Sequence, residues 1–115
     1  MTVTLYHNPR CSKSRETLLL LRARGIEPEI IDYLKNPPTA KELEDLVEKL
    51  GLGAEAILRV KEPAFKALGL DPARLSEAAI VKIIEENPAL LERPIVVKGA
   101  RAALGRPPEN ALAIL

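Results

Sequence analysis

The chain has 115 residues, of which 47% are hydrophobic and 29% are charged. This balance is typical of a globular protein, and the length suits one hydrophobic core, so we expect a single domain over residues 1–115. The formal net charge is +1 and tryptophan is absent, so neither a basic field nor stacking rings indicate nucleic-acid binding. No apolar run approaches the roughly 20 residues that span a membrane. With no leader-like segment before the first predicted strand, we expect a cytoplasmic protein without a membrane partner.

The first third of the chain predicts a β-strand, an α-helix and a second β-strand. Residues 3–6 form a short apolar strand, and residues 7–10 have the composition of a loop. A helix is predicted over residues 12–24, ending at Gly25, and the second strand over residues 29–33. Two short strands joined by one helix run parallel with a right-handed crossover.

The middle of the chain is predicted to be helical. Thr39 and Glu42 have the spacing of a capping box and open a helix that runs through Leu50. An apolar stripe follows that helix, made by Leu43, Leu46, Val47 and Leu50. Further helices are predicted over residues 54–58, 63–68 and 76–86.

The last segment returns to strands. Residues 94–97 and 100–104 are predicted to pair as an antiparallel hairpin around a turn at residues 98–99, before a final helix from about Pro107. This order of elements predicts an α/β, thioredoxin-like fold. Its mixed four-stranded sheet is flanked by helices on both faces, and a helical insertion separates the second and third strands. No apolar surface stripe predicts self-association, so we expect a monomer.

Cys11 is the residue on which we expect the chemistry to centre. It lies between the first strand and the first helix, where unpaired amides and the helix dipole favour a thiolate and also an oxyanion. Arg10, Lys13 and Arg15 add positive charge, and Ser14 has a hydroxyl to donate. A lone cysteine is commonly an inert buried residue, but this one stands in a polar segment rather than an apolar run.

Cys11 is also the single cysteine of the chain, which excludes an internal disulfide and an internal pair of redox cysteines. Any redox chemistry at Cys11 therefore takes its electrons from a separate thiol. His7 fits either a loop histidine or a group that acts near the thiolate, and the sequence leaves both open.

Three later arginines stand beside turn or proline signals: Arg59, Arg93 and Arg106. Each fits a solvated surface charge when taken singly. Together, planar bidentate donors near a helix N-terminus would suit a tetrahedral oxyanion. Pro94, at the start of the third strand, is a candidate for a cis peptide bond.

Four ordered motifs resemble the arsenate reductases of the glutathione- and glutaredoxin-coupled type, the ArsC-like proteins with a thioredoxin-like fold. They are HNPRCSKSRETL at 7–18, RVKE at 59–62, LERPIV at 91–96 and GRPPE at 105–109. The resemblance covers essentially the whole chain. It implies an enzyme of arsenical resistance that reduces arsenate to arsenite.

The resemblance also implies roles for individual residues. Cys11 would be the nucleophile, forming a covalent bond to arsenic, and Arg59, Arg93 and Arg106 would bind the oxyanion. His7 and Ser14 would tune or hold the thiolate, and Pro94 would be cis. We further expect Ser12 and Arg15 to contribute to substrate binding. No metal and no bound cofactor are expected; glutathione would be the co-substrate and glutaredoxin the protein partner.

Two alternatives remain within the resemblance, because short relatives include proteins with other activities. The first is a glutathione-dependent thiol reductase of another substrate. The second is a redox-responsive regulator that binds RNA polymerase. Such regulators typically carry two cysteines separated by two residues, whereas Ser14 stands at the second of those positions here. The three arginines favour arsenate or a similar oxyanion.

Overall fold

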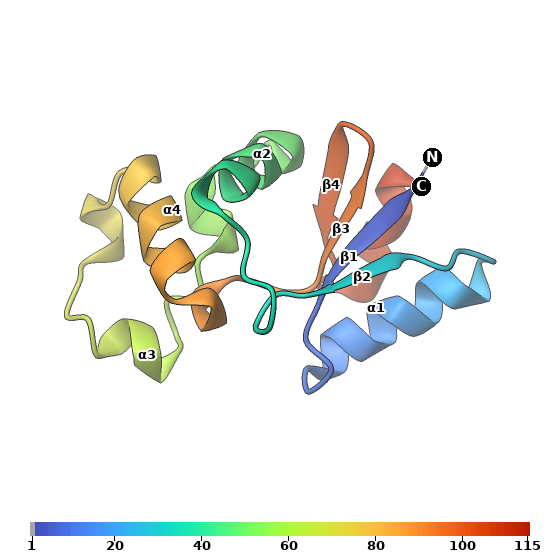
Figure 1. The fold of residues 1–115 in the computed structure, drawn as a ribbon, viewed down its shortest axis with the longest axis horizontal. Coiled ribbons are helices and arrows are strands. Elements are labelled where there is room, and N and C mark those ends of the chain that lie inside the picture. Colours follow the sequence, from blue (N-terminus) through green and yellow to red (C-terminus); the bar gives the residue numbers. More distant parts are fainter. Residues whose placement is uncertain (1) are drawn as a thin grey trace. The chain divides into compact units, whose positions relative to one another are not determined.

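The computed structural model describes residues 2–115 and divides the chain into two compact units. The sheet unit combines the residues up to Asn36 with Arg93–Leu115, and the helical unit is Pro37–Glu92. Figure 1 shows the elements of each. The expectation of one domain over the whole chain stays a prediction.

The sheet unit is built from the two ends of the chain. Its elements are β1 (Val3–His7), α1 (Ser12–Ala23), β2 (Glu29–Asp32), β3 (Ile95–Lys98) and β4 (Arg101–Leu104). The strand order is β2-β1-β3-β4, with β1 parallel to β2 and the other pairs antiparallel. The mixed four-stranded α/β sheet predicted from the sequence is confirmed, including the pairing of β1 with β3.

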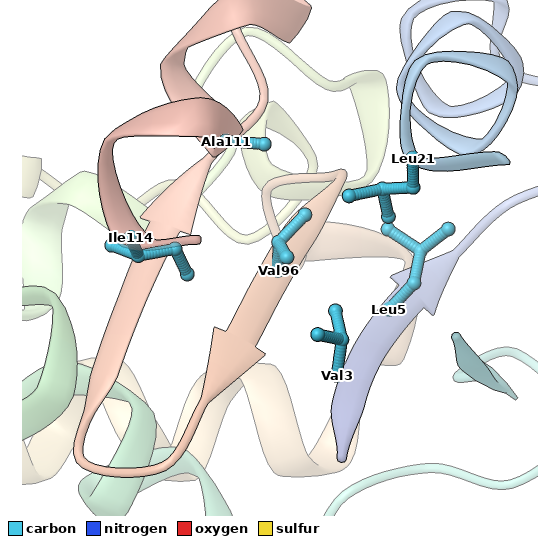
Figure 2. Packing of buried hydrophobic residues seen from close by; sticks show 6 residues of the cluster. All are labelled: Val3, Leu5, Leu21, Val96, Ala111 and Ile114. Carbon is cyan, nitrogen blue, oxygen red and sulfur yellow. The ribbon is translucent and has the colours of Figure 1, made fainter. Parts of the chain in front are cut away.

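One face of this sheet is covered by α1 and by a C-terminal 3₁₀-helix, η4 (Pro108–Ile114). Successive side chains of a strand point to opposite faces, so alternate residues of β1 and β3 reach this layer. There they meet Leu21 of α1 and two residues of η4 (Figure 2). The buried cluster consists of Val3, Leu5, Leu21, Val96, Ala111 and Ile114. This packing holds α1 and η4 against the sheet.

The final helix predicted from about Pro107 is present, and it is a 3₁₀-helix rather than an α-helix. The backbone amide of Asn110 bonds to the Pro107 carbonyl at 3.0 Å. The side-chain amide of Asn110 takes the Arg106 carbonyl, also at 3.0 Å. A regular α-helix would direct the Asn110 backbone amide to that same Arg106 oxygen. The asparagine side chain therefore replaces the α-helical bond.

The helical unit follows the predicted order. Its α-helices are α2 (Ala40–Leu50), α3 (Pro63–Lys66) and α4 (Glu77–Glu86). Short 3₁₀-helices lie between them, η1 (Ala54–Ile57) and η2 (Pro72–Arg74), and a third, η3 (Pro88–Leu90), follows α4. The capping box of Thr39 and Glu42 is present in both directions, as predicted. Leu43 and Leu46 of the predicted stripe are buried.

In the helical unit, the segment that follows η1 pairs with the segment that follows η3. Leu58 forms a β-bridge with Leu91. The Arg59 amide donates to the Leu90 carbonyl and the Glu92 amide to the Ile57 carbonyl, each at 2.8 Å. These bonds place Arg59 beside Glu92. Within residues 2–115, no helix has the length and apolar character that a bilayer crossing requires.

Candidate active site

Cys11 is the N-cap residue of α1 and follows a tight turn that begins where β1 ends. Its amide donates to the Asn8 carbonyl at 2.9 Å, closing a four-residue turn. The Asn8 side-chain oxygen accepts from the Arg10 amide at 3.0 Å. Asparagine favours this local bond, so the residues before Cys11 fix the turn that presents it.

The Cys11 side chain is enclosed, because the residue is only 9% exposed. One cause is the guanidinium group of Arg106, whose Nη2 lies 3.5 Å from the Cys11 sulfur. A cation close to the sulfur shields it and favours its ionised form.

The pKa of the Cys11 thiol is lowered. Burial is the largest influence and by itself raises the pKa, but several hydrogen bonds and a charge together outweigh it. These are the backbone amide of Ser14, the side chain and positive charge of Arg93, and the backbone amide of Lys13. The expected lowering of this pKa is present, and its sources are the first turn of α1 and an arginine from the far end of the chain.

His7 reaches Ser14, which supports the thiolate through its backbone amide. His7 Nδ1 lies 2.5 Å from Ser14 Oγ, and the Asn8 amide donates to the same oxygen at 3.1 Å. Ser14 is fully buried. Burial, the largest influence, lowers the pKa of His7; nearby Asp32 raises it, and Arg22 and Arg15 lower it. A neutral His7 therefore holds the hydroxyl of a residue whose amide stabilises the sulfur.

Arg15 and Ser12 occupy the first turn of α1 with exposed side chains. Arg15 Nη1 donates to the Pro9 carbonyl at 2.9 Å. Its guanidinium thus braces the turn before Cys11. The substrate-binding roles expected for these two residues stay predictions.

Arg93 and Arg106 come together although 12 residues separate them in the chain. Arg106 Nε donates to the Arg93 carbonyl at 2.7 Å. The peptide bond between Arg93 and Pro94 is cis, as predicted; a second cis bond, Arg106–Pro107, was not. Of the three arginines named from the sequence, these two lie at the Cys11 sulfur, one by a direct contact and one through its effect on the thiol.

Gly105 allows this approach because there is no room for a side chain. A Cβ at this position would lie 2.6 Å from Thr17 Oγ1 and 2.7 Å from Pro94 Cγ. The Thr17 hydroxyl is itself held by the Lys13 carbonyl at 2.9 Å. The Gly105 amide donates to the Pro94 carbonyl at 2.9 Å. Gly105 is the first residue of the GRPPE motif and stands directly before Arg106, but no role was predicted for it from the sequence.

Arg59 belongs to the helical unit, where two carboxylates hold it. Its Nε lies 2.8 Å from Glu62 Oε1, and its Nη1 lies 2.8 Å from Glu92 Oε1. The three side chains are between 21% and 27% exposed. Both glutamates lie in the motifs named from the sequence, but no role was predicted for them; the three-residue spacing of Arg59 and Glu62 was the available signal. The convergence of Arg59 on Cys11 stays a prediction.

The sheet unit thus combines a nucleophile with an anion-binding environment: a sulfur with a lowered pKa, amides of a helix N-terminus and two guanidinium groups. Within the part of the chain that the structure describes, no three acidic, histidine or cysteine side chains gather into a metal site. Fold and site together define a thioredoxin-like protein whose single cysteine has a lowered pKa and an arginine beside its sulfur.

Comparison with known proteins names the group to which this chain belongs. It is a member of the ArsC family, whose model matches residues 6–114. A protein named arsenate reductase in Haemophilus influenzae is 48% identical over the full length of both chains. The Escherichia coli protein YfgD, described as uncharacterized, is 50% identical over 98% of this chain and 96% of its own.

A solved structure shows the same fold. The structure titled arsenate reductase from Vibrio cholerae superposes with a TM-score of 0.95 at 49% identity, covering 100% of this chain and 98% of that one. The thioredoxin-like fold predicted from the sequence is confirmed, and so is the resemblance to arsenate reductases.

Proposed function

We propose that this protein reduces arsenate to arsenite through a covalent bond between Cys11 and arsenic, with external thiols supplying the electrons. The observation that carries the proposal is the contact of the Cys11 sulfur with Arg106, in a site where Arg93 also favours the thiolate. A tetrahedral dianion needs donors of this kind beside the nucleophile. Relatives named arsenate reductase, at 48% to 50% identity, support this choice of anion.

In the first step the Cys11 thiolate attacks the arsenic of monohydrogen arsenate. A sulfur–arsenic bond forms, one arsenic–oxygen bond breaks, and the hydroxyl oxygen leaves as water after taking up one proton. The guanidinium groups of Arg93 and Arg106 offset the charge of the remaining oxygens, and Arg59 is the third arginine of the proposed anion site. Arsenic stays in the +5 state at this point.

Reduction needs two electrons, and the single cysteine of this chain cannot supply them by forming an internal disulfide. A first external thiol bonds to arsenic and displaces a second oxygen as water. A second thiol then attacks the sulfur of the first, and a disulfide forms between them. The sulfur–arsenic bond of the first thiol breaks, and its electron pair stays on arsenic, which becomes As(III). Water releases arsenite and regenerates Cys11. We propose glutathione as the first thiol and glutaredoxin as the second.

The test is a turnover assay that measures arsenite formed from arsenate. We expect turnover with glutathione and glutaredoxin together, and none in the Cys11→Ser variant. Equal turnover with thioredoxin as the electron donor would contradict the proposed thiol system but not the proposed reaction.

A second substrate separates the alternative function. A protein that reduces a glutathione mixed disulfide while leaving arsenate unchanged is a general thiol reductase. A protein that does neither, and whose Cys11 is not protected from alkylation by arsenate, is a binding protein. Either result contradicts the proposal.

A further inference from the structure

The Arg106 side chain reaches the nucleophile from an exposed segment of the sheet unit, so its position depends on what holds that segment. Its Nη2 lies 3.5 Å from the Cys11 sulfur, and its Nε donates to the Arg93 carbonyl at 2.7 Å. A long exposed side chain has many rotamers available. The contact with the sulfur is therefore only as well defined as the backbone from which the side chain starts.

The backbone of Arg106 offers few groups by which it can be held. The next residue is Pro107, which has no amide hydrogen, so the carbonyl is the only hydrogen-bonding group of the peptide unit that joins them. That carbonyl accepts from the side-chain amide of Asn110 at 3.0 Å. The orientation of this peptide unit is thus set by the Asn110 side chain.

Asn110 is itself firmly placed. Its backbone amide donates to the Pro107 carbonyl at 3.0 Å. The next residue of η4, Ala111, is fully buried in the cluster that packs α1 and η4 against the sheet (Figure 2). A continuous series of contacts therefore runs from the hydrophobic cluster through Asn110 to the carbonyl of Arg106.

We propose that Asn110 is a positioning residue: by holding the Arg106 carbonyl, it keeps the guanidinium group of Arg106 at the Cys11 sulfur. Asn110 acts through this arginine and not through a contact of its own with the reacting atoms. Its expected effect on arsenate turnover rests on the proposed function, whereas its expected effect on the thiolate rests on the geometry of the site alone.

The same hydrogen bond also has a purely structural interpretation, because a side chain that satisfies a nearby carbonyl stabilises a turn wherever it occurs. The helical unit contains an equivalent bond. Asn87 Nδ2 donates to the Ile83 carbonyl, four residues earlier, at 3.0 Å, which is the donor, the spacing and the distance found for Asn110. Asn87→Ala is therefore a matched control that loses the same kind of bond at a different carbonyl.

The first test measures the thiolate without any turnover, as the pH dependence of Cys11 alkylation by iodoacetamide. Asn110→Ala should raise the pKa of Cys11, because a cation near the sulfur favours the thiolate and this cation is then held less firmly. The shift should be smaller than in Arg106→Ala, which removes the charge itself. Asn110→Gln keeps a side-chain amide and should recover part of the shift, and Asn87→Ala should match the wild type.

The second test is a double-mutant cycle on arsenate turnover. Asn110→Ala should lower kcat/KM about threefold to tenfold, the scale of one neutral hydrogen bond. In an Arg106→Ala background the same substitution should cause no further loss, because no guanidinium group remains to be positioned. Asn87→Ala should again match the wild type. Because Asn110 is exposed, we expect every variant to fold, which circular dichroism checks.

The outcomes separate this inference from the proposed function. Equal losses from Asn110→Ala with and without Arg106, or an equal pKa shift in Asn87→Ala, would make Asn110 a structural residue and overturn the inference. Wild-type alkylation and turnover in a folded Asn110→Ala would overturn it as well. The expected pKa shift in a protein that does not reduce arsenate would support the inference and contradict the proposed function alone.

Discussion

Two arginines of this molecule, one in each unit, have opposite electrostatic surroundings. Arg106 of the sheet unit directs one nitrogen to the Cys11 sulfur and another to the Arg93 carbonyl. Arg59 of the helical unit directs two nitrogens to the carboxylates of Glu62 and Glu92. The first contact favours a negative sulfur, whereas the second surrounds one positive charge with two negative ones.

The comparison shows two different things that an arginine can provide: its positive charge, or a guanidinium group held in a fixed position. Arg106 lends its charge to the nucleophile. The Arg59 charge is balanced by Glu62 and Glu92, whose side chains are 27% and 22% exposed, so these ion pairs fix the guanidinium more firmly than exposed ones would. Arg106 therefore acts on the thiolate, whereas the guanidinium of Arg59 is held in a fixed orientation by its own carboxylates.

The largest expected effect comes from removing the nucleophile. Cys11→Ser should abolish arsenate reduction, because a serine hydroxyl stays un-ionised at neutral pH and cannot form the sulfur–arsenic bond. The fold should persist, since the residue sits at a helix start rather than in the hydrophobic cluster. Arsenite formation and circular dichroism measure the two properties. Residual turnover in this variant would place the chemistry elsewhere.

The next effect concerns Arg106. Arg106→Ala should lower kcat/KM for arsenate about a hundredfold, the upper end of the range for losing a charge-assisted hydrogen bond. It should also raise the pKa of Cys11, measured as the pH dependence of alkylation by iodoacetamide. Arg106→Lys should recover part of the activity, because lysine restores charge without the planar geometry. An unchanged alkylation profile would show that Arg106 does not lower the pKa of Cys11.

Arg59 should show a smaller effect and of a different kind. Arg59→Ala should lower kcat/KM for arsenate about tenfold through loss of one charge-assisted bond. The pKa of Cys11 should stay where it is, because the groups that lower it belong to the sheet unit. Glu92→Gln, which removes one of the two ion pairs, should lose less. If Arg59→Ala shifted the alkylation profile as Arg106→Ala does, the two arginines would act alike.

The pH dependence of stability provides a fourth test. The pKa of Cys11 is lowered in the folded protein, so the unfolded chain binds more protons between the folded and unfolded values. Cys11 therefore contributes stability that is present above the unfolded value, about 8.5, and is lost as the pH falls through the folded value. Denaturant unfolding of wild type and Cys11→Ser should diverge toward alkaline pH. Parallel curves would contradict a lowered pKa.

The smallest effect should appear at the capping box of the helical unit. Thr39→Ala should reduce the free energy of unfolding by about 1 kcal/mol, because the Glu42 amide loses the bond that it donates to Thr39 Oγ1 at 3.2 Å. Cys11 alkylation should not change. A coupled change in alkylation would show that the helical unit influences the thiolate.

Local patterns predicted most of the fold. The capping box at Thr39, the glycine after α1 and the strand at Ile95 all lie where the sequence placed them, because each depends on neighbours along the chain. The final helix was predicted in its place but without its type, which is 3₁₀. Its form depends on which donor, backbone or side chain of Asn110, takes the Arg106 carbonyl, and residue types do not decide that.

Cys11, the centre of the site, could be predicted from the sequence, but the residues that reach it or each other from distant parts of the chain were harder to predict. A cysteine before a helix indicated a lowered pKa because the helix terminus is a local feature. The contact between Arg106 and the sulfur spans 95 positions, so spacing alone did not provide it; the family motif did. Glu92, which holds Arg59 across 33 positions, has the same long-range character, and no role was predicted for it.

At Gly105, the effect of a substitution on the fold and its effect on the site can differ. Any side chain there must push against Thr17 and Pro94, and the Thr17 hydroxyl is already anchored to the first turns of α1. The segment that would yield is the end of β4, and the next residue along it is Arg106. A variant that relieved the clash by shifting this segment could keep a folded sheet and still withdraw the guanidinium from the sulfur. A variant at position 105 that folds normally can therefore still have lost the contact between Arg106 and the Cys11 sulfur.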